Sequence, residues 1–116
     1  MAIANTRLTS TGITTVYTSS GNNAITTIIV CNTGTVDLTD ETVRASNLDL
    51  YLVPSGLSGD TEATQIISKL TIPAGETVFF SEERVVLSTG DTVQAKCSST
   101  GGVGGLLTIT VSTLPV

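Results

Sequence analysis

The amino-acid sequence predicts an all-β protein, an antiparallel β-sandwich or jelly-roll-like domain of about seven to nine short strands. Short runs of alternating apolar and polar residues recur along the chain, most clearly over residues 48–98. Pro-Ser-Gly, Pro-Ala-Gly and Thr-Gly-Asp separate these runs and are typical turn sequences. Only 13% of the residues are charged, and β-branched threonine, which suits strands, is plentiful. The length of 116 residues predicts a single β-sandwich domain over 1–116, with 1–12 as a possible N-terminal arm.

The first half of the chain contains the most apolar predicted strand. Residues 3–9 form either an N-terminal strand or an arm, and residues 13–18 form a strand of β-prone residues. Residues 24–31 are apolar at both alternating sets of positions, which predicts a strand at the centre of its sheet. Residues 35–45 have no clear period, so we expect a long loop there, with a helical turn over 40–44 as an option.

The second half of the chain alternates more regularly. A strand is predicted over 48–53, with its three leucines toward the core and Asp49 and Tyr51 on the opposite face. A loop rich in Gly and Ser follows over 54–62. Further strands are predicted over 76–80, over 91–98 and over the last apolar run, and residues 84–87 either form a strand of their own or continue the strand over 76–80. In the last two strands the residues expected to face the core are Val93, Ala95, Cys97, Leu107, Ile109 and Val111.

Residues 63–72 allow both a helix and a strand. Ala63, Ile66, Ile67 and Leu70 have helical spacing, and Asp60 is suited to cap such a helix. In a strand, Ile66, Leu70 and Ile72 share one face, while Lys69 and Thr71 share the other. We prefer the strand, because two β-branched isoleucines are adjacent and Pro73 follows at once.

The charge balance and hydropathy limit the possible partners. Five Lys and Arg residues oppose ten Asp and Glu, and the net charge of −5 argues against nucleic acid and anionic membranes. No apolar run approaches the ~20 residues of a membrane span. The opening MAIANTRLTSTG lacks the regions of a signal peptide, which predicts a protein that stays in the cytosol or leaves it by lysis. A mean hydropathy of +0.35 with so few charges predicts self-association or burial in a larger assembly.

The chain carries little chemistry for catalysis. It has no histidine, which removes Ser-His-Asp and Cys-His arrangements and histidine metal ligands. The GGVGG segment lacks the lysine and the following helix of a phosphate-binding loop. Loop carboxylates that suit a glycosidase or a calcium site are Asp37, Asp40 and Glu41, then Asp60 and Glu62, then Glu82 and Glu83. We interpret these as solvated loop charges and predict that the protein is not an enzyme, with no catalytic, cofactor-binding or metal-binding residues.

The cysteines and aromatic residues also favour a structural role. Cys31 and Cys97 either form a disulfide between two strands, as in immunoglobulin-like domains, or are two buried free thiols. We prefer the free thiols, which suit a protein made in a cytosol. The two tyrosines and two phenylalanines lie mostly in predicted strands and are interpreted as core, so no aromatic platform for sugars is evident.

The order of motifs resembles that of small virion proteins of tailed bacteriophages, which act as capsid decoration (cement) or tail-associated proteins. The motifs are VCNTGT, LDLYLVPSGLSGDTEA, LTIPAGETVFF and VVLSTGDTVQAKCSS, and the match covers most of residues 13–111. The positions that carry the match are Tyr17, Cys31, Asn32, Thr33 and the segments 50–56, 74–77 and 90–96. The chain departs from the family pattern over 36–46, where the family usually has a short hairpin, and this insertion can itself contact a neighbouring subunit.

The resemblance implies a non-enzymatic virion protein made in the host cytoplasm. Its leading form is a capsid decoration protein that stabilises the head at capsomer junctions, binds the major capsid protein and self-associates, with a trimer favoured. A tail, neck or fibre component that binds tail or neck proteins is the alternative within the virion. A receptor- or glycan-binding module, acting through the loops over 55–59 or 101–105, is the alternative from another class. The family supplies no catalytic residues to transfer.

Overall fold

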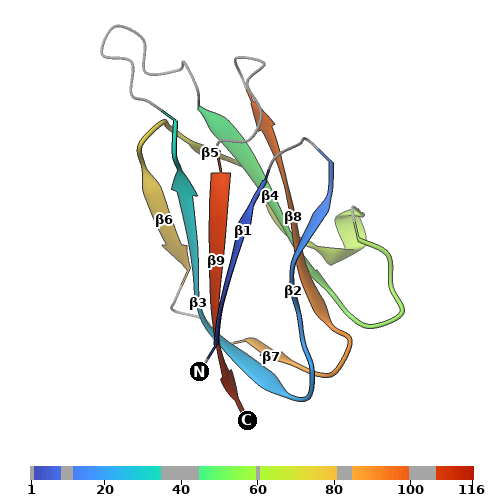
Figure 1. Ribbon diagram of the computed structural model, residues 1–116. Helices are drawn as coiled ribbons and strands as arrows, with labels where there is room; N and C mark the ends of the chain where they lie inside the picture. The colour runs from blue at the N-terminus through green and yellow to red at the C-terminus, as the bar shows by residue number, and fades with distance from the viewer. Residues whose placement is uncertain (1, 9–11, 35–44, 60, 81–84, 100–106) are drawn as a thin grey trace, which may run out of the picture.

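Two antiparallel sheets pack face to face around one core (Figure 1). The computed structural model describes residues 2–8, 12–34, 45–59, 61–80, 85–99 and 107–116. One sheet has the order β1-β9-β3-β6, with β7 also paired to β3, and the other has the order β2-β8-β4-β5. The elements are β1 (Ala2–Arg7), β2 (Thr14–Thr18), β3 (Asn23–Asn32), β4 (Ser46–Val53), the 3-10 turn η1 (Glu62–Thr64), β5 (Gln65–Ile72), β6 (Thr77–Phe80), β7 (Val85–Leu87), β8 (Thr92–Ser99) and β9 (Leu107–Pro115). The predicted all-β sandwich is confirmed.

The pairing of the strands is nested along the chain. β4 pairs with β5, β3 with β6 and β7, β2 with β8, and β1 with β9, all of them antiparallel. The first and the last strand of the chain are therefore neighbours, and the strands between them pair in the same nested way. This is the arrangement of a jelly roll, in which the paired strands wrap together around the core.

The core lies between the inner faces of the two sheets. From the five-stranded sheet, β3 contributes Val30 and β9 contributes every second residue from Leu107 to Val111, all of them buried. From the other sheet, β8 contributes Val93, Ala95 and Cys97, as predicted. The leucines at 48 and 50 are buried and the leucine at 52 packs against the same cluster, so the predicted inner face of β4 is confirmed.

Three tight turns correspond to the three turn sequences. The backbone N–H donates to the carbonyl three residues earlier within the segments 54–57, 73–76 and 88–91. The third residue of each turn is a glycine with a positive φ, of 87°, 79° and 90°. Residues with a Cβ rarely adopt this backbone, which is the physical reason why Pro-Ser-Gly, Pro-Ala-Gly and Thr-Gly-Asp punctuate the strands.

Segment 63–72 is a strand, as predicted, but one of its faces was assigned wrongly. Among the residues described near this segment, the only helical structure is the single 3-10 turn η1 just before β5. β5 itself is an edge strand that pairs with β4. Ile66 was expected on the same face as Leu70 and Ile72, but it is 51% exposed, while Ile67 packs against the core with them. The register with β4 shifts twice: Ile66 is one extra residue, and a further extra residue lies between Ile67 and Leu70, where it changes the face of Ile66 and Ile67 relative to Leu70. An extra residue reverses the alternation, and the sequence period alone does not reveal it.

The remaining element predictions have clear outcomes. Residues 2–7 form a paired strand rather than an arm, β3 lies inside its sheet between β9 and β6, and β7 is a strand of its own. The long loop expected over 35–45 lies outside the described residues except at its end, as does the loop over 101–105. Among the described residues, no helix has the length and apolar composition needed to cross a membrane.

Asn32 links the two sheets within the CNT motif. Its side chain is buried, and its Nδ2 donates to the carbonyl of Ile72 at the end of β5, at 2.8 Å. Its Oδ1 accepts from the backbone N–H of Gly34 at 2.9 Å. A buried amide with both ends bonded holds the end of β3 against the opposite sheet. This part of the motif therefore has a structural role.

Candidate functional site

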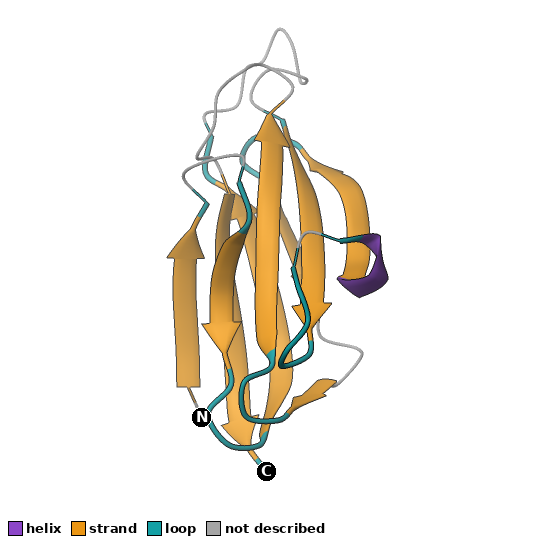
Figure 2. Cartoon of the chain, turned by 90° about the vertical axis from the view of Figure 1, so that its right-hand side faces the viewer, coloured by secondary structure: helices purple, strands orange, loops and turns teal. Residues whose placement is uncertain are grey.

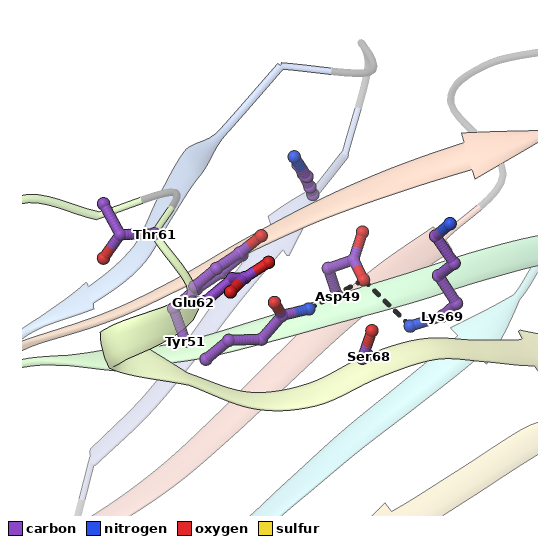
Figure 3. A pocket seen from close by; sticks show the side chains of 8 residues that line it. Asp49, Tyr51, Thr61, Glu62, Ser68 and Lys69 are labelled. Atoms are coloured by element: carbon purple, nitrogen blue, oxygen red, sulfur yellow. Dashed lines mark hydrogen bonds between the residues drawn. The ribbon is translucent and has the colours of Figure 1, made fainter.

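A polar pocket lies on the outer face of the four-stranded sheet, where the turn η1 leads into β5 (Figure 3). Its volume is about 350 Å³. The lining side chains come from β4, β5, β8 and the η1 region, and they are Asp49, Tyr51, Thr61, Glu62, Gln65, Ser68, Lys69 and Lys96. The pocket thus combines two carboxylates, two amines, an amide and three hydroxyl groups.

Asp49 is the centre of this pocket. Its side chain is only 7% exposed, although it points away from the core. Oδ1 accepts from the backbone N–H of Lys69 at 2.8 Å and from Nε2 of Gln65 at 3.0 Å, and these bonds are drawn in Figure 3. A carboxylate with so little access to water needs such donors, because burial without them is costly. Asp49 therefore ties the edge strand β5 to its neighbour β4.

The position of these donors follows from a second bulge in β5. Leu48 faces Leu70 and Leu50 faces Ile67, so two residues of β5 lie opposite Asp49 alone. One of the two, Lys69, has a φ of 51°, a left-handed backbone that is uncommon without glycine. This geometry turns the Lys69 N–H toward Asp49. Lys96 of β8 lies directly across from Asp49 on its other side.

The pocket offers many hydrogen-bond donors and acceptors. No group of three His, Cys, Asp or Glu residues is placed to hold a metal ion within the described part of the chain. Tyr51 is only 2% exposed, so its ring offers no open face for stacking on a sugar. The mixture of donors and acceptors carries balanced formal charges, which fits a small neutral ligand with several hydroxyl groups.

A second feature is the outer face of the five-stranded sheet. Ile3 of β1, Phe79 of β6 and Val86 of β7 are 67%, 63% and 62% exposed. Leu114 of β9 is also exposed, and Ala24 lies between it and Val86 in the register. Phe79 was interpreted as core, and that interpretation was wrong. It alternates with the inward-facing Val78 and Phe80, so it points outward.

This outer face carries few charges for its size. Between the exposed apolar side chains lie hydroxyl groups of β9, Thr108, Thr110 and Ser112. The described strand residues that face outward include one charged side chain, Arg7 at the corner. An apolar and hydroxyl-rich surface with so few charges resembles an interface more than an ordinary solvated face.

The predicted absence of a disulfide is confirmed, but the predicted burial holds for one thiol only. Neither Cys31 nor Cys97 forms a disulfide bond. Cys97 lies in the core on β8, as predicted, while Cys31 is half-buried on β3, in the opposite sheet. Cys31 alternates with the core residue Val30 and therefore points to the outer face. The two thiols face different sides of their sheets and are not placed to form a bond.

Most of the carboxylates that the sequence suggested lie outside the described residues. These are Asp37, Asp40, Glu41, Asp60, Glu82 and Glu83. Glu62 is described, is exposed and lines the polar pocket. The sequence placed Asp49 on the correct face but gave no sign of its partners, because the bulges that create them depend on the pairing with β4.

Asp91 has a structural role that the sequence analysis missed. Its two carboxylate oxygens accept from the backbone N–H groups of Ser55 at 2.8 Å and Ser88 at 2.9 Å. These bonds hold the pKa of Asp91 below its ordinary value, with the Ser55 bond the larger cause. The Thr-Gly-Asp sequence is the only signal, since aspartate commonly accepts from the backbone in turns. Asp91 joins two turns at one end of the sandwich.

Comparison of the chain with protein-family models, with curated proteins and with solved structures found no match.

Proposed function

We propose that this chain is a non-enzymatic structural protein of a tailed-bacteriophage virion, and that it decorates the capsid surface at capsomer junctions. The observation that carries the proposal is the outer face of the five-stranded sheet, with its exposed Ile3, Phe79 and Val86 and its low charge. A decoration protein needs a rigid body and an apolar face that covers a partner. Here the partner is the major capsid protein together with further copies of this chain.

The fold and the composition support the same role. Jelly rolls recur in viral capsid domains, although fold-level analogy alone does not decide function. The order of motifs resembles that of the phage virion proteins. The described acidic residues, Asp49, Glu62, Glu76 and Asp91, lie outside the strands of the five-stranded sheet. A net charge of −5 would help to keep a densely covered particle soluble. A tail or neck component would share these features.

The first test is the location and copy number of the chain in phage particles. Cryo-electron microscopy and quantitative mass spectrometry are expected to place on the order of hundreds of copies on the shell, as icosahedral symmetry requires. About six to a few dozen copies at the tail or neck would favour the alternative within the virion. Absence from particles would overturn the proposal.

The second test is a pair of matched surface variants. Phe79→Glu places a charge on the proposed contact face, whereas Leu57→Glu changes a residue of similar exposure, 60% against 63%, in the loop after β4. Added to phage particles that lack the protein, the Phe79 variant is expected to bind at least ten times more weakly than wild type. The Leu57 variant is expected to bind normally. Equal binding by both variants would contradict the use of this face.

The polar pocket favours a second candidate function, the binding of a neutral saccharide. The almost fully buried Asp49 and the surrounding donors and acceptors carry this candidate. Saturation-transfer NMR with a panel of neutral oligosaccharides tests it. Binding that is lost in Lys96→Ala and Glu62→Ala but kept in Leu57→Ala would support it. No binding at millimolar saccharide would remove it. The loop over 55–59, suggested by the sequence, does not line this pocket, and the loop over 101–105 lies outside the described residues.

A further inference from the structure

The free edge of β1 differs from the other sheet edges that the structure describes. β1 pairs with β9 over six consecutive residues without any register shift. β2 has a register shift between Thr15 and Tyr17, and β5 has two. β6 is only four residues long. Bulged and short edges resist the addition of another strand, whereas a regular edge is a template for one.

One hydrogen bond identifies which backbone groups of β1 face outward. Leu8 donates its backbone N–H to the carbonyl of Leu107 at 2.9 Å, in the same register that pairs β1 with β9. Hydrogen-bonded pairs alternate along an antiparallel ladder, so Thr6 and Ala4 also bond to β9. The N–H and C=O groups of Ile3, Asn5 and Arg7 therefore point to the free edge. Figure 2 shows β1 at the margin of the molecule, running up from the N-terminus.

We propose that β1 of a second copy of this chain adds to this edge in antiparallel orientation, forming one continuous sheet across two molecules. The inference rests on the self-association in the proposed function and names the contact. If a two-fold axis relates the two copies and both cores lie on the same side of the shared sheet, odd-numbered residues of one β1 lie opposite odd-numbered residues of the other. Aligning the outward groups then places Asn5 opposite Asn5 and Ile3 opposite Arg7 of the second copy.

Charge supports a second copy as the occupant. Each chain carries a net charge of −5, so two copies repel unless they meet where acidic residues are absent. β1 contains no acidic residue, and its one charge, Arg7, lies opposite Ile3 rather than another arginine in this register. Ile3, at 67% exposed, becomes covered by the stem of that arginine.

The contact has two consequences for assembly. A two-fold axis produces a dimer, so a trimer, which the sequence analysis favoured, would need a different contact. The paired edges cover less than the ~800 Å² per partner of a standard interface, so the dimer is expected to be weak in dilute solution. The high local concentration on a particle surface would favour it.

Amide hydrogen exchange measured by NMR at two protein concentrations tests the proposal directly. In the full-length protein, the amides of Ala4 and Thr6 are expected to be protected at every concentration, because they bond to β9. The amides of Ile3, Asn5 and Arg7 are expected to gain at least tenfold protection between about 20 μM and about 1 mM. If β1 only completed its own sheet, exchange at these amides would not depend on protein concentration. Unchanged exchange at these three amides would overturn the proposal.

Variants at Asn5 separate the backbone from the side chain. Asn5→Pro removes an outward N–H but no bond to β9, and edge positions tolerate proline. It is expected to sediment as a monomer, whereas Asn5→Ala, which loses only the side-chain bond to Thr110, dimerises like wild type. If Asn5→Pro fails to fold, Ile3→Lys replaces it and is expected to weaken the dimer at least tenfold, because lysine then lies opposite Arg7. Dimers of unchanged strength in the folded variant would overturn the contact.

The two proposals fail in different ways. A chain that remains a monomer at millimolar concentration but covers the capsid would refute only the β1 contact. A chain that dimerises through β1 but is absent from particles would refute only the virion role.

Discussion

Replacement of Asp49 by alanine is expected to destabilise the protein more than its outward-facing position suggests. The carboxylate is 7% exposed and accepts bonds from the backbone of Lys69 and the side chain of Gln65. Its removal deletes both bonds and releases the strained turn of the β5 bulge. The edge strand then loses a side-chain tie to β4 at its most irregular point.

The magnitude follows from the two bonds. A hydrogen bond to a charged group contributes about 1.5–3 kcal/mol, and two such bonds would reach about 3–6 kcal/mol if fully buried. Lys69 is exposed, so in the variant water can accept a hydrogen bond from its N–H and recover part of the lost free energy. We therefore expect the free energy of unfolding to fall by about 2–4 kcal/mol in Asp49→Ala. Asp49→Asn keeps an acceptor oxygen and is expected to lose about half as much.

Urea unfolding followed by circular dichroism measures this difference, with Asn47→Ala as the matched control. Asn47 lies two residues earlier on the same face of β4, and its Oδ1 accepts from Thr71 at an exposed position. The control substitution is expected to lower the free energy of unfolding by about 0.5–1 kcal/mol. Amide exchange should also quicken at Lys69 in the Asp49 variant alone. If both alanine variants lower the free energy of unfolding by the same amount, the proposed role of Asp49 is refuted.

Three further predictions concern single positions. Lys69→Gly is expected to raise the free energy of unfolding by up to about 1 kcal/mol, because glycine accepts the φ of 51° without steric cost; a loss on urea unfolding would contradict this. Gly90→Ala is expected to lower the thermal midpoint, at a cost of about 1–3 kcal/mol, since a Cβ there lies 2.8 Å from Oγ of Ser55 and φ is 90°; an unchanged midpoint would count against it. Because the pKa of Asp91 is lowered in the folded state, its stabilising contribution is complete above the unfolded pKa of about 4 and disappears as the pH falls through the folded pKa. Urea unfolding should therefore show a gap between wild type and Asp91→Asn at pH 7 that narrows in acid, and a gap independent of pH would exclude this linkage.

Much of the fold could be predicted because the strands alternate with a period of two. Residues 93, 95 and 97 face the core as expected, and so do 107, 109 and 111. The glycines at the third turn positions mark the ends of strands for a local reason, their positive φ. The candidate site was harder, because Asp49 becomes a buried centre only when Gln65 and Lys69 are brought to it by a bulge. No short pattern in the sequence announces an extra residue whose partner lies across the sheet.

The sequence by itself determined the class of the protein, the inner faces of its regular strands, the positions of its tight turns and the lack of histidine chemistry. These properties depend on residues close together in the chain, through backbone preference and alternation. Only the tertiary structure decided that Phe79 and Cys31 point outward, that Asp49 is buried, and that β1 is the regular free edge. Each of these depends on which strand lies alongside and in what register, and pairing between distant segments is not encoded in any local pattern.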